Sequence, residues 1–169
     1  MHMIAGPNGA GKSTLYDYLV APRYPDLPFA RSEPERDALL AARGSFVCES
    51  TFSRPAELAF LTRVKAEGFQ VVLYIVCLDD PIKLLQRVRG GEPGAGDDML
   101  GRKVLERYPR TLRNLQLGVR VADMSLLINS GDPHEGGPDL VASVTAGQMH
   151  LRTATRPAWA DKVLGFAEC

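Results

Sequence analysis

The chain has 169 residues, which is enough for one domain with a sizeable hydrophobic core, and we expect residues 1–169 to form a single domain. Its 20 Lys and Arg balance its 20 Asp and Glu, and this excludes a surface-wide basic field for nucleic acid or an anionic membrane. No apolar run approaches the roughly 20 residues of a membrane span. Cys48, Cys77 and Cys169 are far apart and read as reduced cysteines of a cytosolic protein. We therefore predict a cytoplasmic protein that binds neither nucleic acid nor membrane.

A phosphate-binding loop stands at the start of the chain, where residues 6–14 fit the pattern G-x-x-x-x-G-K-[ST] completely. The pattern assigns nucleoside triphosphate binding to Gly6, Pro7, Asn8, Gly9, Ala10, Gly11, Lys12, Ser13 and Thr14. Lys12 can reach the β- and γ-phosphates, and the Ser13 hydroxyl can bind Mg²⁺. Ile4 and Ala5 supply a short strand before the loop, and residues 13–20 read as a helix after it. We therefore predict that the chain binds a nucleoside triphosphate with Mg²⁺.

The next elements follow from local capping signals. Residues 21–28 contain three prolines and predict a loop. Ser32, with Glu35 three residues later, predicts the start of a helix that ends at Gly44. Residues 45–49 read as a short strand, and Ser53 is expected to cap a helix that begins at Pro55 and stops at Gly68.

Residues 71–78 are apolar without alternation, as in a strand buried on both faces of a parallel sheet. Asp80 should cap the following helix, with Ile82, Leu85 and Val88 facing the core. A helical stretch from Asp97 should break or restart at Pro109. Beyond it we expect a strand over 125–129, an edge hairpin over 140–151 and a closing helix over 157–166.

Strands that alternate with helices predict a three-layer α/β fold of the P-loop NTPase, nucleotide kinase-like type, with a parallel central sheet. In such a fold the ligand lies at the carboxyl ends of the strands. Glu49, Ser50, Thr51 and Ser53 leave one of these strands beside the phosphate loop. We expect Glu49, Ser50 and Thr51 to bind the substrate, because a carboxylate and hydroxyls can hold a sugar or nucleoside hydroxyl or a water of Mg²⁺. Ser53 is explained by capping of the next helix. Asp80 is better explained as a helix cap.

A basic segment follows the third strand–helix unit. Arg87 and Arg89 close one helix, and Arg107 and Arg110 lie on the next, beyond a glycine-rich stretch. We predict that residues 90–113 form a lid whose arginines clamp phosphates during transfer. A solvated basic helix face is the alternative interpretation.

Several of these segments together resemble the zeta toxin family of P-loop kinases. Residues 48–53, Cys-Glu-Ser-Thr-Phe-Ser, are similar to the family's F-E-T-T-x-S. Residues 106–115 resemble its R-Y-x-R-S-L-x-N-L, Arg87-Val88 its R-V before G-G-H, and Asn129-Ser130 part of its D-N-S.

The resemblance implies a kinase that transfers the ATP γ-phosphate to a UDP-activated amino sugar such as UDP-N-acetylglucosamine, restrained by an antitoxin protein. By position it implies ATP and Mg²⁺ contacts for Lys12 and Ser13, and contacts with the sugar nucleotide for Glu49 and Thr51. It also implies phosphate contacts for Arg87 or Arg89 with Arg107 and Arg110, and we take Lys12, Glu49, Arg107 and Arg110 as the candidate catalytic residues.

The sequence departs from the family at two places. Residues 27–30 resemble the start of the family's second strand, but Arg31 follows and the family's aspartate base is missing. Asp37 is the nearest aspartate, and it falls in a predicted helix. Glu92 replaces the histidine of G-G-H. Besides a sugar-nucleotide kinase, the sequence therefore also fits a kinase with another acceptor, or a nucleotide-binding module that has lost catalysis and acts through a partner.

Overall fold

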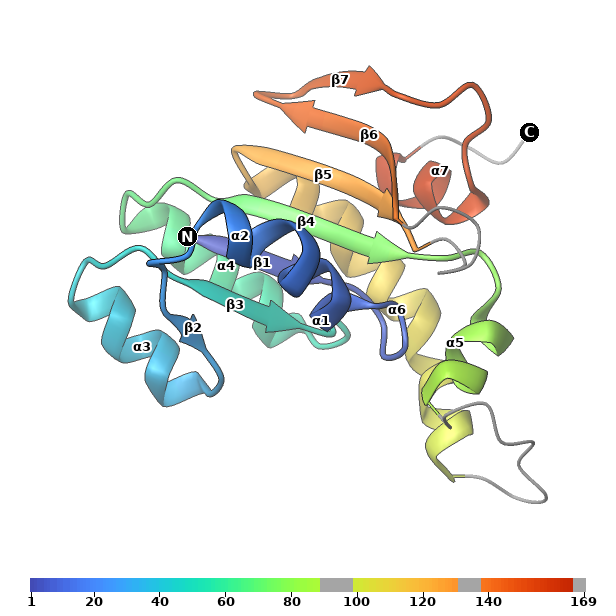
Figure 1. The fold of residues 1–169 in the computed structure, drawn as a ribbon, viewed down its shortest axis with the longest axis horizontal. Coiled ribbons are helices and arrows are strands. Elements are labelled where there is room, and N and C mark those ends of the chain that lie inside the picture. The colour runs from blue at the N-terminus through green and yellow to red at the C-terminus, as the bar shows by residue number, and fades with distance from the viewer. Residues whose placement is uncertain (89–98, 131–137, 166–169) are drawn as a thin grey trace.

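A computed structural model describes residues 1–88, 99–130 and 138–165 of the chain. Its central element is a seven-stranded sheet with helices on both faces (Figure 1). In the order β2-β3-β1-β4-β5-β6-β7, the first five strands are parallel and the last two antiparallel. The strands are β1 His2–Ala5, β2 Phe29–Ala30, β3 Val47–Ser50, β4 Val72–Cys77, β5 Met124–Asn129, β6 Asp139–Thr145 and β7 Gln148–Leu151. The predicted α/β class with a mostly parallel sheet is confirmed.

The helices cover the two faces of the sheet as two separate apolar layers. They are α1 Lys12–Leu15, the π-helical turn η1 Tyr16–Val20, α2 Ala21–Arg23, α3 Glu33–Ala41, α4 Pro55–Ala66, α5 Pro81–Val88, α6 Met99–Val121 and α7 Ala158–Leu164. Alternation along β1 shows the layering, because Met3 packs with the residues of α4, α6 and α7 while Ile4 packs with Leu15 and Leu84 on the other face. Among the described residues, no helix is both long and apolar enough to cross a membrane.

The helix after the phosphate loop runs farther than predicted, since it continues through Pro22 to Arg23. The N–H of Ala21 donates to the carbonyl of Tyr16, five residues back, so the hydrogen-bond register slips just before Pro22. Proline has no N–H to donate, and the wider turn lets the helix pass it. The prediction that a loop begins at residue 21 was therefore wrong, since the helix extends to Arg23.

The predicted break at Pro109 is also wrong, because α6 is one continuous helix of 23 residues with Pro109 inside it. A proline in a helix interior costs roughly 3 kcal/mol. Val104 lies before the proline and Leu112 and Leu115 after it, and all three side chains are buried. Packing on both sides of Pro109 therefore outweighs the local penalty.

Two further expectations about helices were wrong in detail. In α5 the buried residue is Leu84, at 0% exposure, whereas Ile82 is 57% exposed, so the core-facing stripe is Leu84 and Val88, four residues apart. At the start of α4 the cap residue is Arg54, whose N–H donates to Glu57 Oε2 at 2.7 Å, and not Ser53. The Ser53 hydroxyl instead bonds to Thr51 Oγ1 at 3.1 Å.

Several local predictions are confirmed. Ser32 Oγ accepts from the Glu35 N–H at the start of α3, and Asp80 Oδ1 accepts from the Ile82 N–H at the start of α5. The edge hairpin is formed by β6 and β7, joined by a turn at residues 146–147. The end of α3 differs in one detail. Arg43, with φ 56°, has the left-handed backbone there, whereas the sequence predicted that Gly44 would end the helix.

Candidate functional site

The phosphate loop leaves β1 at the centre of the sheet and packs tightly against β4 and α5. A Cβ atom on Gly6 would lie 2.0 Å from the carbonyl oxygen of Val76. On Gly9, where φ is 79°, it would lie 2.4 Å from the carbonyl oxygen of Leu84. Only glycine fits such close approaches of backbone to backbone. Gly6 therefore lets the loop pack against the end of β4, and Gly9 lets it pack against α5.

A cavity of about 770 Å³ opens over this loop, within the size range of small-molecule sites. Its lining comes from several elements that are separate in the sequence: the phosphate loop with α1 and η1, the ends of β3 and β4, α5, Ser130 after β5 and Pro138 before β6. The polar residues among them are Asn8, Lys12, Ser13, Thr14, Glu49, Arg87 and Ser130. The structure thus brings Glu49 and Arg87 to the same cavity as the phosphate loop.

Lys12 is folded back into the loop. Its Nζ donates to the carbonyl oxygens of Gly6 at 3.1 Å and Pro7 at 3.2 Å. Burial lowers the pKa of this ammonium, and the nearby Glu49 carboxylate acts in the opposite direction. A half-buried ammonium that donates to two carbonyl oxygens would gain further stabilisation from a phosphate anion.

The three candidate substrate residues at the end of β3 have different surroundings. Glu49 is exposed in the cavity and pairs with Ile4 in the sheet register. Ser50 is buried, and its hydroxyl accepts a hydrogen bond from the N–H of Phe52 at 2.9 Å. Thr51 lines a second, small cavity of about 20 Å³. Glu49 is therefore the one of the three whose side chain faces the phosphate-loop cavity.

The small cavity connects the phosphate loop to α6. Besides Thr51, its lining includes Pro7 and Asn8 of the loop and Lys103 and Arg107 of α6. Arg110 is exposed on the same helix but lines neither of these two cavities. The structure thus brings Arg107 to the loop and leaves Arg110 farther along α6.

The predicted lid is described only in part. Arg89 and the rest of residues 89–98 lie outside the described residues. The remainder, residues 99–113, is the first half of α6, whose Val104 and Leu112 are buried against the body of the protein. Closure of this segment over phosphates stays a prediction.

Ser130 and Lys103 are site residues to which the sequence analysis gave no role. Ser130 follows β5, and the rule that ligands bind at the carboxyl ends of parallel strands could have found it, as it found Glu49. Lys103 precedes Arg107 by one helical turn, so the spacing that singled out Arg107 could have included it.

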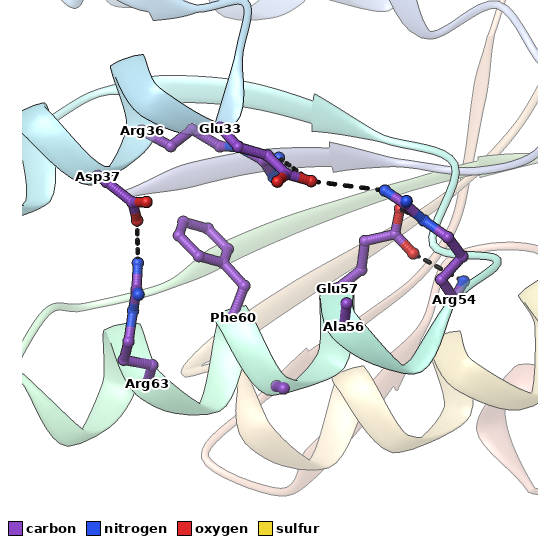
Figure 2. A pocket seen from close by; sticks show the side chains of 9 residues that line it. Glu33, Arg36, Asp37, Arg54, Ala56, Glu57, Phe60 and Arg63 are labelled. Carbon is purple, nitrogen blue, oxygen red and sulfur yellow. Dashed lines mark hydrogen bonds and ion pairs between the residues drawn. The ribbon is translucent and has the colours of Figure 1, made fainter.

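A further cavity of about 310 Å³ lies between α3 and α4 (Figure 2). Here Asp37 forms an ion pair with Arg63, and Glu33 lies 3.6 Å from Arg54. Asp37 does not line the phosphate-loop cavity. The end of β2 is followed by Arg31, whose guanidinium lies 5.6 Å from the centre of the Phe29 ring. The structure therefore places Asp37 in an exposed ion pair between α3 and α4.

The oxygen donors that the loop cavity offers suit Mg²⁺. Ser13 is exposed beside Lys12, and the Glu49 carboxylate lines the same cavity. A hydroxyl and a carboxylate, together with nucleotide phosphates and water, are the ligands that Mg²⁺ takes in nucleotide sites. Within the described ranges there is no group of three or more His, Cys, Asp or Glu that could hold a metal ion by itself.

A mostly parallel sheet with a phosphate loop between its central strand and the following helix defines a P-loop NTPase fold. No protein-family model matches the chain, and no curated protein matches it by sequence. Among solved structures it is similar to those of the AvrRxo1-ORF1:AvrRxo1-ORF2 complex. The structure with ATP matches with a TM-score of 0.61 at 14% identity over 89% of this chain, and the native structure with 0.59 at 16% over 90%.

The chain spans about 60% of the length of the AvrRxo1 chain that it matches. At such low identity the likeness shows a shared fold, and it leaves substrate and activity to be argued from the site.

Proposed function

We propose that the protein is an ATP-dependent small-molecule kinase, similar to zeta toxins, that transfers the γ-phosphate to a UDP-activated amino sugar such as UDP-N-acetylglucosamine. One observation carries the proposal: a complete phosphate loop, a strand-end carboxylate and an arginine line the same cavity. The similar AvrRxo1 structure that was determined with ATP supports ATP as the donor.

Each residue then has a definite task. The loop backbone and Lys12 would hold the phosphates, and Ser13 would bind the Mg²⁺ that neutralises their charge. Glu49 would accept the proton of the attacking hydroxyl, since its carboxylate is exposed in the cavity. Arg107, beside the loop, would stabilise the charge that is redistributed during transfer, and Arg110 would take a secondary part.

A second function is favoured by a specific feature of this chain. The end of β2 lacks the carboxylate that serves as the base in the zeta toxin family and carries Arg31 in its place. A protein with that loss could bind ATP and act through a partner protein instead. The AvrRxo1 structures contain two proteins, ORF1 and ORF2. We include an antitoxin-like partner protein in the proposal for both functions. A kinase that phosphorylates a different small molecule is the third possibility.

Incubation with ATP, Mg²⁺ and a panel of UDP-sugars, other sugar nucleotides and nucleosides, followed by mass detection, tests these functions. The kinase proposal expects one acceptor to gain a phosphoryl group in the wild type and none to do so with Lys12→Ala. ATP binding without any phosphorylated product would favour the binding module. A product only with acceptors other than sugar nucleotides would replace the proposed substrate.

A further inference from the structure

Ser130 is fixed at the rim of the phosphate-loop cavity. Its N–H donates to the carbonyl oxygen of Cys77 at 2.8 Å, which extends the pairing of β4 with β5 by one residue. Its hydroxyl oxygen lies 3.2 Å from the position that a Cβ on Gly11 would take. The hydroxyl therefore borders the glycine that precedes Lys12, inside the surface that receives phosphate.

Arg87 reaches the same residue from α5. Its Nη1 donates to Ser130 Oγ at 2.6 Å, and its Nη2 approaches the Ser130 carbonyl oxygen at 3.4 Å. A guanidinium has only donors, so Ser130 Oγ must be the acceptor in the first bond. The hydroxyl hydrogen can then point to another acceptor. A nucleotide phosphate beside Gly11 would supply one.

The end of β5 is held from the other side as well. Asn129 Oδ1 accepts from the indole N–H of Trp159 at 3.3 Å, and Asp79 Oδ1 accepts from the Trp159 backbone N–H at 2.7 Å. Trp159 is buried at the start of α7. The Asn129 side chain is thus turned toward α7, while the next residue, Ser130, serves the cavity.

We propose that Ser130 is a positioning residue of the nucleotide site: its hydroxyl donates to a phosphate of the bound nucleotide and holds the Arg87 guanidinium beside that phosphate. This rests on the proposed function only in that a nucleotide must occupy the cavity; it requires no phosphoryl transfer. Two charge-assisted contacts would then depend on one small side chain. Loss of that side chain should weaken phosphate binding through both.

Calorimetric titration with ATP and with ADP, each with Mg²⁺, tests the proposal on the whole chain. We expect Ser130→Ala to weaken binding of at least one of the two nucleotides roughly tenfold, because a bond to a charged group is lost and a second is misdirected. The affected nucleotide tells which phosphate is contacted: loss for ATP alone indicates the γ-phosphate, and loss for both indicates the α- or β-phosphate. Ser130→Thr keeps the hydroxyl and should restore most of the affinity.

Coupling between the two residues separates positioning from a general structural effect. In Arg87→Ala, adding Ser130→Ala should cost much less than it costs in the wild type, because the two side chains act as a unit. The matched control is Ser125→Ala, because Ser125 lies on β5 itself and its buried hydroxyl has no hydrogen-bond partner among the described residues. It should leave both affinities unchanged.

Wild-type affinity for both nucleotides in Ser130→Ala, or additive losses in the double variant, would overturn the inference. The wild-type titration distinguishes this from failure of the proposed function. If the wild type binds neither nucleotide, both proposals are wrong. If the wild type binds and Ser130→Ala binds equally well, only the role of Ser130 is wrong.

Discussion

The side-chain amide of Asn114, on α6, donates to the carbonyl oxygen of Phe52 at 3.0 Å and ties this helix to the turn after β3. Phe52 has a left-handed backbone with φ 55°, which is uncommon for a residue other than glycine, and its side chain is fully buried. Thr111, one turn earlier on α6, donates to the carbonyl oxygen of Thr51 at 3.2 Å. The helix that carries Arg107 therefore also shapes the segment that carries Glu49 and Thr51.

Replacement of Asn114 by Ala should reduce the free energy of unfolding by about 1–3 kcal/mol, since the Phe52 carbonyl would lose its side-chain donor in a partly buried turn. Urea denaturation measures the change. Arg113→Ala, at an exposed neighbouring position of the same helix, is the control and should change stability by less than about 0.5 kcal/mol. Equal effects of the two substitutions would show that Asn114 does not stabilise the turn.

Glu49 and Asp37 can be distinguished directly as candidate bases. Glu49→Gln should lower the rate of phosphoryl transfer by more than tenfold, because a positioned general base is worth ~10²–10⁴. Asp37→Asn should leave the rate nearly unchanged, since Asp37 pairs with Arg63 between α3 and α4 (Figure 2). Steady-state kinetics with the acceptor found in the panel provide the measurement. A large loss with Asp37→Asn alone would reverse the assignment.

The two arginines of α6 should differ. Arg107→Ala should reduce turnover strongly with little change in ATP affinity, as expected of a group that meets the transferring phosphoryl; such an arginine is worth up to ~10³–10⁵. Arg110→Ala should have a smaller effect, because Arg110 lines neither cavity at the loop. Kinetics beside ATP titration test both variants. Equal losses in turnover and affinity for Arg107→Ala would contradict a role in transfer.

The pKa of Lys12 gives a pH dependence with a defined sign. Burial lowers this pKa below the ordinary value of 10.5, so between the lowered value and 10.5 the unfolded chain binds more protons than the folded one. The stability of the protein without ligand should therefore rise with pH across that window. ATP affinity should fall across it, because the neutral amine no longer attracts phosphate. Lys12→Ala should lack both contributions, and an unchanged pH profile in that variant would assign them to another group.

Much of the framework could be predicted because its signals are local. The phosphate loop is a contiguous motif, β4 is a continuous apolar run, and the caps at Ser32 and Asp80 act within three residues. The approach of Glu49 to the loop was predictable from topology, since parallel strands bring their carboxyl ends to one edge of the sheet.

Other features depend on contacts that sequence spacing does not contain. The continuity of α6 through Pro109 depends on side chains buried on both sides of that proline. Which side of α5 is buried depends on how the helix packs on the sheet: Leu84 points to the core and Ile82 to solvent. The hydrogen bond from Arg87 to Ser130 joins residues that are 43 positions apart, and no spacing in the sequence predicts it.

Binding of ATP by the phosphate loop is the central claim, and thermal unfolding of wild type and Lys12→Ala with and without Mg²⁺-ATP tests it most directly. A ligand that binds only the native state raises its stability, by roughly 2.7 kcal/mol when its concentration is 100 times the dissociation constant. The account predicts a clear rise in the wild-type melting temperature that Lys12→Ala largely abolishes. An unchanged wild-type melting temperature at millimolar ATP, or an equal rise in both proteins, would contradict it.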